Sequence, residues 1–186
     1  MNEVKRKAIH LSALAIPIGV WLVSSSTAFG VLGLIGSIWI TGDALRLIIP
    51  SWNEKLSRIF NPVIRQKEKK KSLTGSSYLL LSSFLSVAFY PKPIAVLALT
   101  FLILGDTAAA LVGSRWGRIS LFPGKSLEGS LACLGACLGI GLALSLVPFW
   151  KALIGAVVAA AAEALPFGPD DNLTMPLTSG AVMTLL

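Results

Sequence analysis

Residues 93–113 read PIAVLALTFLILGDTAAALVG, an apolar run in which Asp106 is the one charged side chain. An α-helix that crosses a hydrocarbon core of about 30 Å needs about 20 mostly apolar residues. Thr27–Ile49 and Leu127–Val147 are similar runs of comparable length. The sequence therefore predicts helices that span a membrane, one of which carries a carboxylate inside its apolar stretch.

The composition of the whole chain supports this prediction. Of its 186 residues, 54% are apolar and 13% are charged, and the mean hydropathy is +0.77. Soluble domains carry about 25% charged residues. Such a composition excludes a disordered chain and an ordinary soluble enzyme, and two cysteines within one apolar run do not suggest a disulfide-stabilised secreted domain.

Shorter apolar runs complete a set of seven candidate spans. The additional runs are Ala8–Val23, Gly75–Tyr90, Ala152–Leu165 and Leu173–Leu186, and Pro93–Gly113 is the fourth of the seven. We expect an all-α fold, a polytopic integral membrane helix bundle of about seven transmembrane helices. Residues 1–186 are expected to form a single membrane-embedded domain.

The distribution of charge predicts the orientation of the bundle. All but two of the 16 Lys and Arg residues, the exceptions being Lys92 and Lys151, fall in or near the N-terminus and the larger loops. By the positive-inside rule, the N-terminus and these loops are cytoplasmic. The net charge of +7 thus reflects topology, and nucleic-acid binding is not expected.

The nine acidic residues all belong to the predicted cytoplasmic half. Asp43 and Asp106 lie inside spans, where an ionisable group costs about 2.5–3.5 kcal/mol on insertion scales and usually marks function. Arg46 follows Asp43 at a spacing that allows an ion pair on one helix face, a structural alternative for Asp43. The one-sided placement favours chemistry on a polar cytoplasmic substrate.

Residues 123–130, PGKSLEGS, form a glycine-bearing turn at the start of the fifth span. Free N–H groups at a helix N-terminus, the ammonium of Lys125 and the hydroxyls of Ser126 and Ser130 could bind an anion. A Walker A loop is excluded because its first glycine position holds Ile119. The alternative is a capped helix with an interfacial lysine.

In order along the chain, several segments resemble the CTP-dependent lipid kinase family, which includes dolichol and polyprenol kinases, phytol kinases and CTP-using diacylglycerol kinase. The resemblance extends from Arg6 to Pro176. The matching segments are Arg6–His10, Asp43–Arg46, Leu73–Tyr78, Gly105–Gly113 with Gly117, Gly124–Ser130, Glu163–Pro166, and Asp171-Asn172 followed by Pro176.

The resemblance implies transfer of the γ-phosphoryl group of CTP to a lipid hydroxyl with a divalent metal, Mg²⁺. Candidates for the catalytic carboxylate are Asp43, Asp106 and Glu128, and candidate metal ligands are Asp106, Glu163 and Asp171. Candidates for nucleotide and phosphate binding are Arg6, Lys7, His10, Arg46, Gly113, Gly124, Lys125, Ser126, Gly129, Ser130 and Asn172.

Two alternatives remain open at this stage. A CTP:phosphatidate cytidylyltransferase uses the same nucleotide, a metal and a lipid, and a small transporter is a non-enzymatic possibility. The lipid alcohol, whether polyprenol or dolichol, phytol or diacylglycerol, is not specified by the sequence. Membrane lipids are the expected surroundings, and the sequence leaves open whether the chain forms a homo-oligomer.

Overall fold

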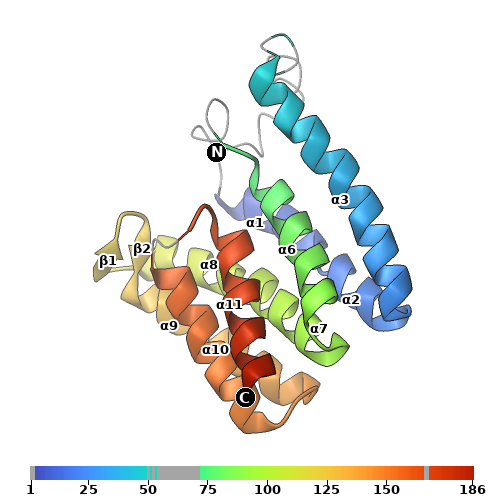
Figure 1. Cartoon of the computed structure of the whole chain (residues 1–186). Helices are drawn as coiled ribbons and strands as arrows, with labels where there is room; N and C mark the ends of the chain where they lie inside the picture. Colours follow the sequence, from blue (N-terminus) through green and yellow to red (C-terminus); the bar gives the residue numbers. More distant parts are fainter. Residues whose placement is uncertain (1–2, 50, 52, 54–71, 166–167) are drawn as a thin grey trace.

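The computed structural model describes residues 3–49, 51, 53, 72–165 and 168–186, without the side chains of residues 3–6 and 8. The described chain consists of helices, the turns that connect them and one short hairpin, which confirms the all-α class (Figure 1). Within these described residues, three helices are long and apolar enough to cross a membrane: Ser25–Ile48, Lys92–Trp116 and Leu127–Leu144. The number of helices that span remains a prediction.

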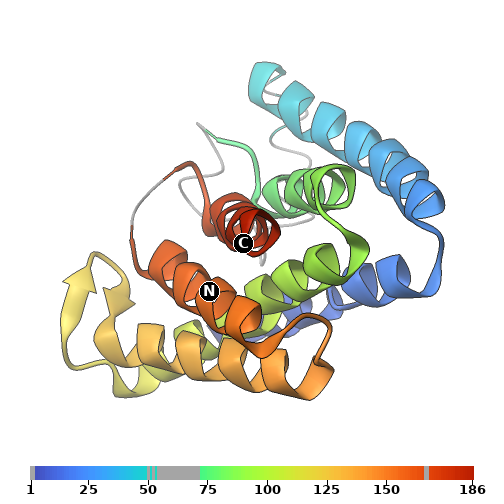
Figure 2. The same ribbon diagram turned by 60° about the horizontal axis from the view of Figure 1, so that its bottom comes forward.

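The run at residues 93–113 becomes the central element of the bundle. It consists of α7 (Lys92–Thr100), a π-helical turn η1 (Phe101–Gly105) and α8 (Asp106–Trp116). Leu97, Ala98 and Phe101 are completely buried. Helices α2, α9 and α11 pack around this element, whereas α3 contacts mainly α6 at the outside (Figure 2).

The first apolar run differs from the single helix predicted over Ala8–Val23. It forms two helices, α1 (Glu3–Ser12) and α2 (Ala15–Leu22), separated by a turn at residues 13–14. Pro17 explains the break, because it has no N–H to donate to Ala13 four residues earlier and its ring crowds that carbonyl. The break lets α1, with Lys7 and His10, contact α8.

On the other side of the central element, α9 (Leu127–Leu144), α10 (Phe149–Ala164) and α11 (Asp171–Leu185) pack in sequence against one another. Small residues allow the close approach. A Cβ at Gly155 of α10 would lie 2.6 Å from Sδ of Met183, and a Cβ at Gly129 of α9 would lie 2.8 Å from the carbonyl oxygen of Ala109. Cys133 and Cys137 are buried free thiols in this core, as expected for small packing residues.

The Gly129 contact yields a first prediction. In Gly129→Ala the new methyl group would meet backbone atoms of α8, which cannot rotate away, so overpacking of about 1–3 kcal/mol should exceed the helix-propensity gain of about 0.5–1 kcal/mol. We expect a lower melting temperature in detergent. Gly135→Ala on the same helix, where a Cβ would have no neighbouring atom within 4 Å, is the matched control and should not be destabilised.

Asp43 and Arg46 form the local ion pair that their spacing predicts, with Arg46 Nε 2.5 Å from Asp43 Oδ1. The other carboxylate oxygen accepts hydrogen bonds from the Thr74 backbone N–H at 2.7 Å and the Ser77 hydroxyl at 2.5 Å. Thr74 caps α6 (Gly75–Phe89). The Asp43 cluster therefore fastens α3 to the start of α6.

Between α8 and α9 the chain forms an antiparallel hairpin of β1 (Ser120–Phe122) and β2 (Lys125–Ser126). Pro123 and Gly124 make its turn, with Gly124 at φ 82°, the pattern of a type II turn. Ser126 then caps α9 by accepting a hydrogen bond from the Gly129 N–H at 3.2 Å. The hairpin fixes Lys125 beside the N-terminus of α9.

Candidate active site

A pocket of about 720 Å³ is lined by Lys7 of α1, one side of α8, the hairpin, and the adjoining ends of α9, α10 and α11. Its charged lining residues come from distant parts of the chain. They are Lys7, Asp106, Arg118, Lys125, Glu163, Asp170 and Asp171. Four are acidic and three are basic, so the described lining concentrates charge in a chain that has little of it.

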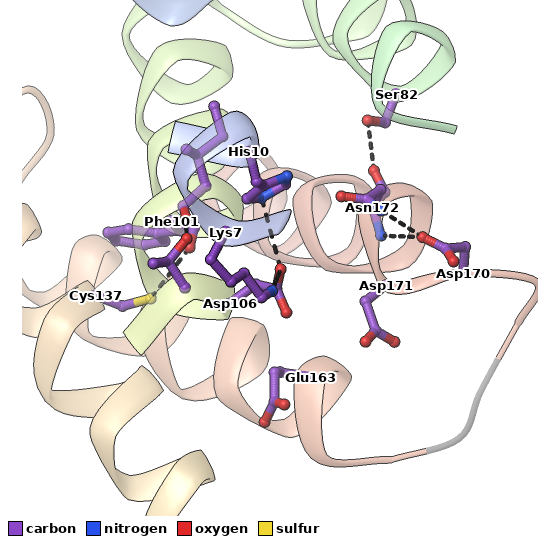
Figure 3. A network of polar contacts seen from close by, with 12 residues as sticks. Lys7, His10, Ser82, Phe101, Asp106, Cys137, Glu163, Asp170, Asp171 and Asn172 are labelled. Carbon is purple, nitrogen blue, oxygen red and sulfur yellow. Dashed lines mark hydrogen bonds and ion pairs between the residues drawn. The ribbon is translucent and has the colours of Figure 1, made fainter. Parts of the chain in front are cut away.

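Asp106 lies buried in one part of this pocket. Its basic partner, Lys7, is far away from it in the sequence. The ammonium of Lys7, itself 3% exposed, donates to Asp106 Oδ2 (Figure 3). Nε2 of His10, one turn further along α1, lies 3.6 Å from the same oxygen. The carboxylate thus faces two side chains of α1, and Lys7 donates a hydrogen bond to it.

The π-helical turn η1 ends immediately before Asp106. Such turns insert an extra residue into a helix and often occur at functional sites. The thiol of Cys137 lies 3.8 Å from the carbonyl oxygen of Phe101 within this turn (Figure 3). A Cβ at Gly105 would meet the sulfurs of Cys137 and Cys133 at 2.7 and 3.0 Å, so the absence of a side chain lets Asp106 begin α8 close to α9.

A second charged group surrounds Lys125. Its Nζ lies 2.7 Å from Glu163 Oε1, at the end of α10, and 2.7 Å from Asp171 Oδ2, at the start of α11. The Ser130 hydroxyl donates to Glu163 Oε2 at 3.1 Å. Burial lowers the pKa of Lys125, but the charges of Asp171 and Glu163 outweigh it and raise that pKa, so Lys125 is charged at neutral pH.

The N-cap of α11 brings a fourth acidic residue to the pocket. Asp170 caps the helix and accepts hydrogen bonds from the N–H of Asn172 at 3.1 Å and from its Nδ2 at 2.5 Å (Figure 3). Since a carboxylate only accepts, these bonds fix the orientation of the Asn172 amide. Oδ1 of Asn172 is buried and has no hydrogen-bond partner within the described part of the chain.

Curated relatives match the chain over most of its length. A protein named CTP-dependent diacylglycerol kinase 1 from Schizosaccharomyces pombe is 30% identical over 210 residues, covering 100% of this chain and 94% of its own. A phytol kinase from Synechocystis is 29% identical over 191 residues, covering 97% and 78%. The chain belongs to the CTP-dependent lipid kinase family. No protein-family model and no solved structure match it.

Membership in this family makes the protein a lipid kinase, and its apolar helices make it an integral membrane protein. A probable phytol kinase 3 from Glycine max is 33% identical over 135 residues, which cover 63% of this chain and 42% of that one. The relatives therefore differ in the lipid alcohol that their names give.

The lipid kinase brings many of its sequence-predicted site residues to one pocket. Among those predicted to bind metal or catalyse, Asp106, Glu163 and Asp171 line it. Among those predicted to bind nucleotide and phosphate, the lining includes Lys7, Gly113, Gly124, Lys125, Ser126 and Gly129. Ser130, His10 and Asn172 contact lining residues.

Other predicted residues of the lipid kinase lie elsewhere. Asp43 and Arg46 form the separate cluster at the start of α6, and neither lines the pocket. Glu128 also does not line it, because both its oxygens accept from the Ile119 N–H, at 3.2 and 3.3 Å, at the base of the hairpin. The side chain of Arg6 lies outside the described residues.

Arg118 and Asp170 line the pocket of the lipid kinase but are absent from the prediction. Asp170 could have been found, because an Asp before an apolar helix is a typical N-cap. Arg118 lies in a loop whose direction is set by the hairpin, and its sequence carries no such signal.

The donor set of this pocket fits a divalent cation such as Mg²⁺, although within the described residues no three His, Cys, Asp or Glu side chains converge as a metal site. Mg²⁺ usually takes one or two carboxylates, phosphate oxygens and water. Glu163 and Asp171 already surround one cationic position, that of Lys125 Nζ. A lining with more acids than bases would also repel a triphosphate that came without a metal.

Proposed function

We propose that this lipid kinase transfers the γ-phosphoryl group of CTP to the hydroxyl group of a lipid alcohol at the cytoplasmic face of the membrane. The observation that carries the proposal is the pocket itself. The Asp106 carboxylate, inside the apolar helix Lys92–Trp116, and the Lys125 ammonium, at the start of α9, line the same cavity. This arrangement supports a reaction between a membrane lipid and a nucleotide. The charge asymmetry of the loops supports the cytoplasmic side.

We assign the two charged groups different tasks. Phosphoryl transfer depends mainly on positioning and on neutralising charge, with a carboxylate to orient the attacking hydroxyl or take its proton. Asp106 is the best candidate for that carboxylate, since Asp43 and Glu128 are engaged outside the pocket. Lys7 holds the Asp106 carboxylate in place by donating a hydrogen bond to it.

The Lys125 group is assigned to the nucleotide. Lys125 directly precedes Ser126, the N-cap of α9, so its ammonium lies at the positive end of that helix, where an anion is favoured. A bound divalent metal, with Glu163 and Asp171 as its candidate ligands, would supply the remaining neutralisation of phosphate charge. Arg118 offers a further cation on the hairpin side.

Diacylglycerol is the lipid alcohol to test first. The match with the relative named CTP-dependent diacylglycerol kinase 1 from Schizosaccharomyces pombe covers 94% of that relative's length. The matches with the relatives named phytol kinase cover 78% of their length or less. Phytol and a polyprenol complete the panel. The assay uses purified protein in mixed micelles with Mg²⁺ and CTP labelled in the γ-phosphoryl group.

The position of the label decides between enzyme classes. A kinase transfers γ-label to the lipid and no α-label, whereas a cytidylyltransferase acting on phosphatidate transfers α-label and releases γ-label as pyrophosphate. We expect γ-labelled lipid, with CTP preferred over ATP. Transfer of α-label, or no labelled lipid with any of the alcohols, would overturn the proposal.

A further inference from the structure

Outside the pocket, a hydrogen bond joins α6 to α11 at a point where a proline removes a backbone donor from α11. Pro176 lies inside α11 and has no N–H, so it leaves the carbonyl oxygen of Asn172, four residues earlier, without its helical partner. The Ser82 hydroxyl of α6 lies 2.6 Å from that oxygen and donates to it (Figure 3). A side chain on another helix thus replaces the missing backbone donor.

This hydrogen bond lies in a buried part of the bundle, where an unpaired carbonyl group would be destabilising. Ser82 is completely buried, Asn172 is 8% exposed and Pro176 is buried as well. Water is excluded from such a position, and in a membrane protein each unsatisfied backbone group is costly. The Ser82 hydroxyl also lies 3.0 Å from the carbonyl oxygen of Leu79 in its own helix, but the shorter contact is to Asn172.

The bond acts on the part of α11 that carries the charged side chains. Asp170 is its N-cap, Asp171 and Asn172 begin its first turn, and the two aspartates line the pocket. The chain that precedes this turn is a loop. On the other side of the turn, the helix lacks the backbone hydrogen bond that residue 176 would donate to Asn172 if it were not a proline. Ser82 therefore supplies a second link between this turn and the rest of the bundle, besides the ion pair of Asp171 with Lys125.

We infer that Ser82 is a positioning residue, which holds the first turn of α11 in register with Lys125 and the pocket by bonding the carbonyl group that Pro176 leaves free. The inference rests on the proposed function for its effect on catalysis, but the link itself can be tested without catalysis. Ser82 does not touch the proposed reacting atoms.

The structural test is hydrogen exchange of the first turn. In Ser82→Ala, backbone amides of residues 171–175 should exchange at least about tenfold faster, which corresponds to about 1.4 kcal/mol. Ser83→Ala is the matched control, because Ser83 is equally buried on the same helix but its hydroxyl donates within that helix, to the carbonyl oxygen of Leu79 at 2.7 Å. Equal exchange at the first turn in both variants would overturn the inference.

The kinetic test compares the effect of Ser82→Ala on kcat/KM for CTP with and without Pro176. Ser82→Ala should lower kcat/KM for CTP about tenfold, and Ser83→Ala should lower it less than twofold. In a Pro176→Ala background residue 176 regains an N–H that can donate to Asn172, so adding Ser82→Ala should then cost less than threefold. A full tenfold loss in that background would show that Ser82 does not act through this carbonyl group.

The two tests separate the inference from the function on which it rests. If the wild-type protein transfers no γ-phosphoryl group from CTP, the proposed function fails, while the exchange comparison still decides the role of Ser82. If the wild-type protein is active and the exchange rates of the two serine variants are the same, the inference alone fails.

Discussion

Asp106→Asn should lower the rate of phosphoryl transfer by at least about a hundredfold, the low end of what a positioned acid or base contributes. The amide is nearly the same size as the carboxylate, so packing beside η1 is retained. It cannot take a proton from the lipid hydroxyl, and it leaves the buried ammonium of Lys7 without its counter-charge. The measurement is the initial rate with γ-labelled CTP, per folded molecule.

Asp43→Asn is the matched control for this change. Asp43 is also buried and ion-paired within an apolar helix, but its partners fasten α3 to α6 and it does not line the pocket. Weakening a buried ion pair should lower the melting temperature in detergent. The rate per folded molecule should stay within about threefold of wild type. Similar kinetic losses in both variants would contradict the assignment of Asp106.

The features that the sequence predicted correctly are those that depend on neighbouring residues. Long apolar runs predicted helices because crossing a membrane requires length and apolarity together. The spacing of Asp43 and Arg46 predicted their ion pair because two residues three apart share a helix face. Pro17 was an available signal for the break between α1 and α2, but the apolar run around it favoured one helix.

The pairing of Asp106 with Lys7 could not be predicted in this way. Ninety-nine positions separate them, and only the packing of α1 against α8 brings them together. Neither the π-helical turn before Asp106 nor the sharing of Lys125 by Glu163 and Asp171 has a local signature. The position of Asn172 four residues before Pro176 was visible, but the donor on α6 was not.

Lys125→Met should lower kcat/KM for CTP by about a hundredfold, mainly through a higher KM. Methionine keeps much of the apolar stem but removes the ammonium that Glu163 and Asp171 share. Removing the ammonium leaves the two carboxylates without compensation, at a cost that is reduced by the partial exposure of the Lys125 and Asp171 side chains. The site would thus lose a cation for phosphate and gain repulsion between two carboxylates.

The pH dependence of this loss in kcat/KM shows whether Lys125 acts as a fixed positive charge or as a group that exchanges a proton during catalysis. Asp171 and Glu163 raise the pKa of Lys125 despite its burial. Its interactions are therefore fully present below the unfolded-state pKa of about 10.4 and are lost only as the pH rises through the higher folded-state value. The ratio of wild-type to Lys125→Met kcat/KM should be constant between about pH 6 and pH 9.

Lys151→Met provides the control for removing a lysine without disturbing the pocket. Lys151 lies at the opposite end of α10 from Glu163, with its ammonium over the ring of Trp150 at 5.4 Å. Its substitution should leave kcat/KM for CTP within about twofold. A ratio for Lys125→Met that changes several-fold with pH would indicate that Lys125 exchanges a proton during turnover, and a loss as small as that of Lys151→Met would remove it from the nucleotide site.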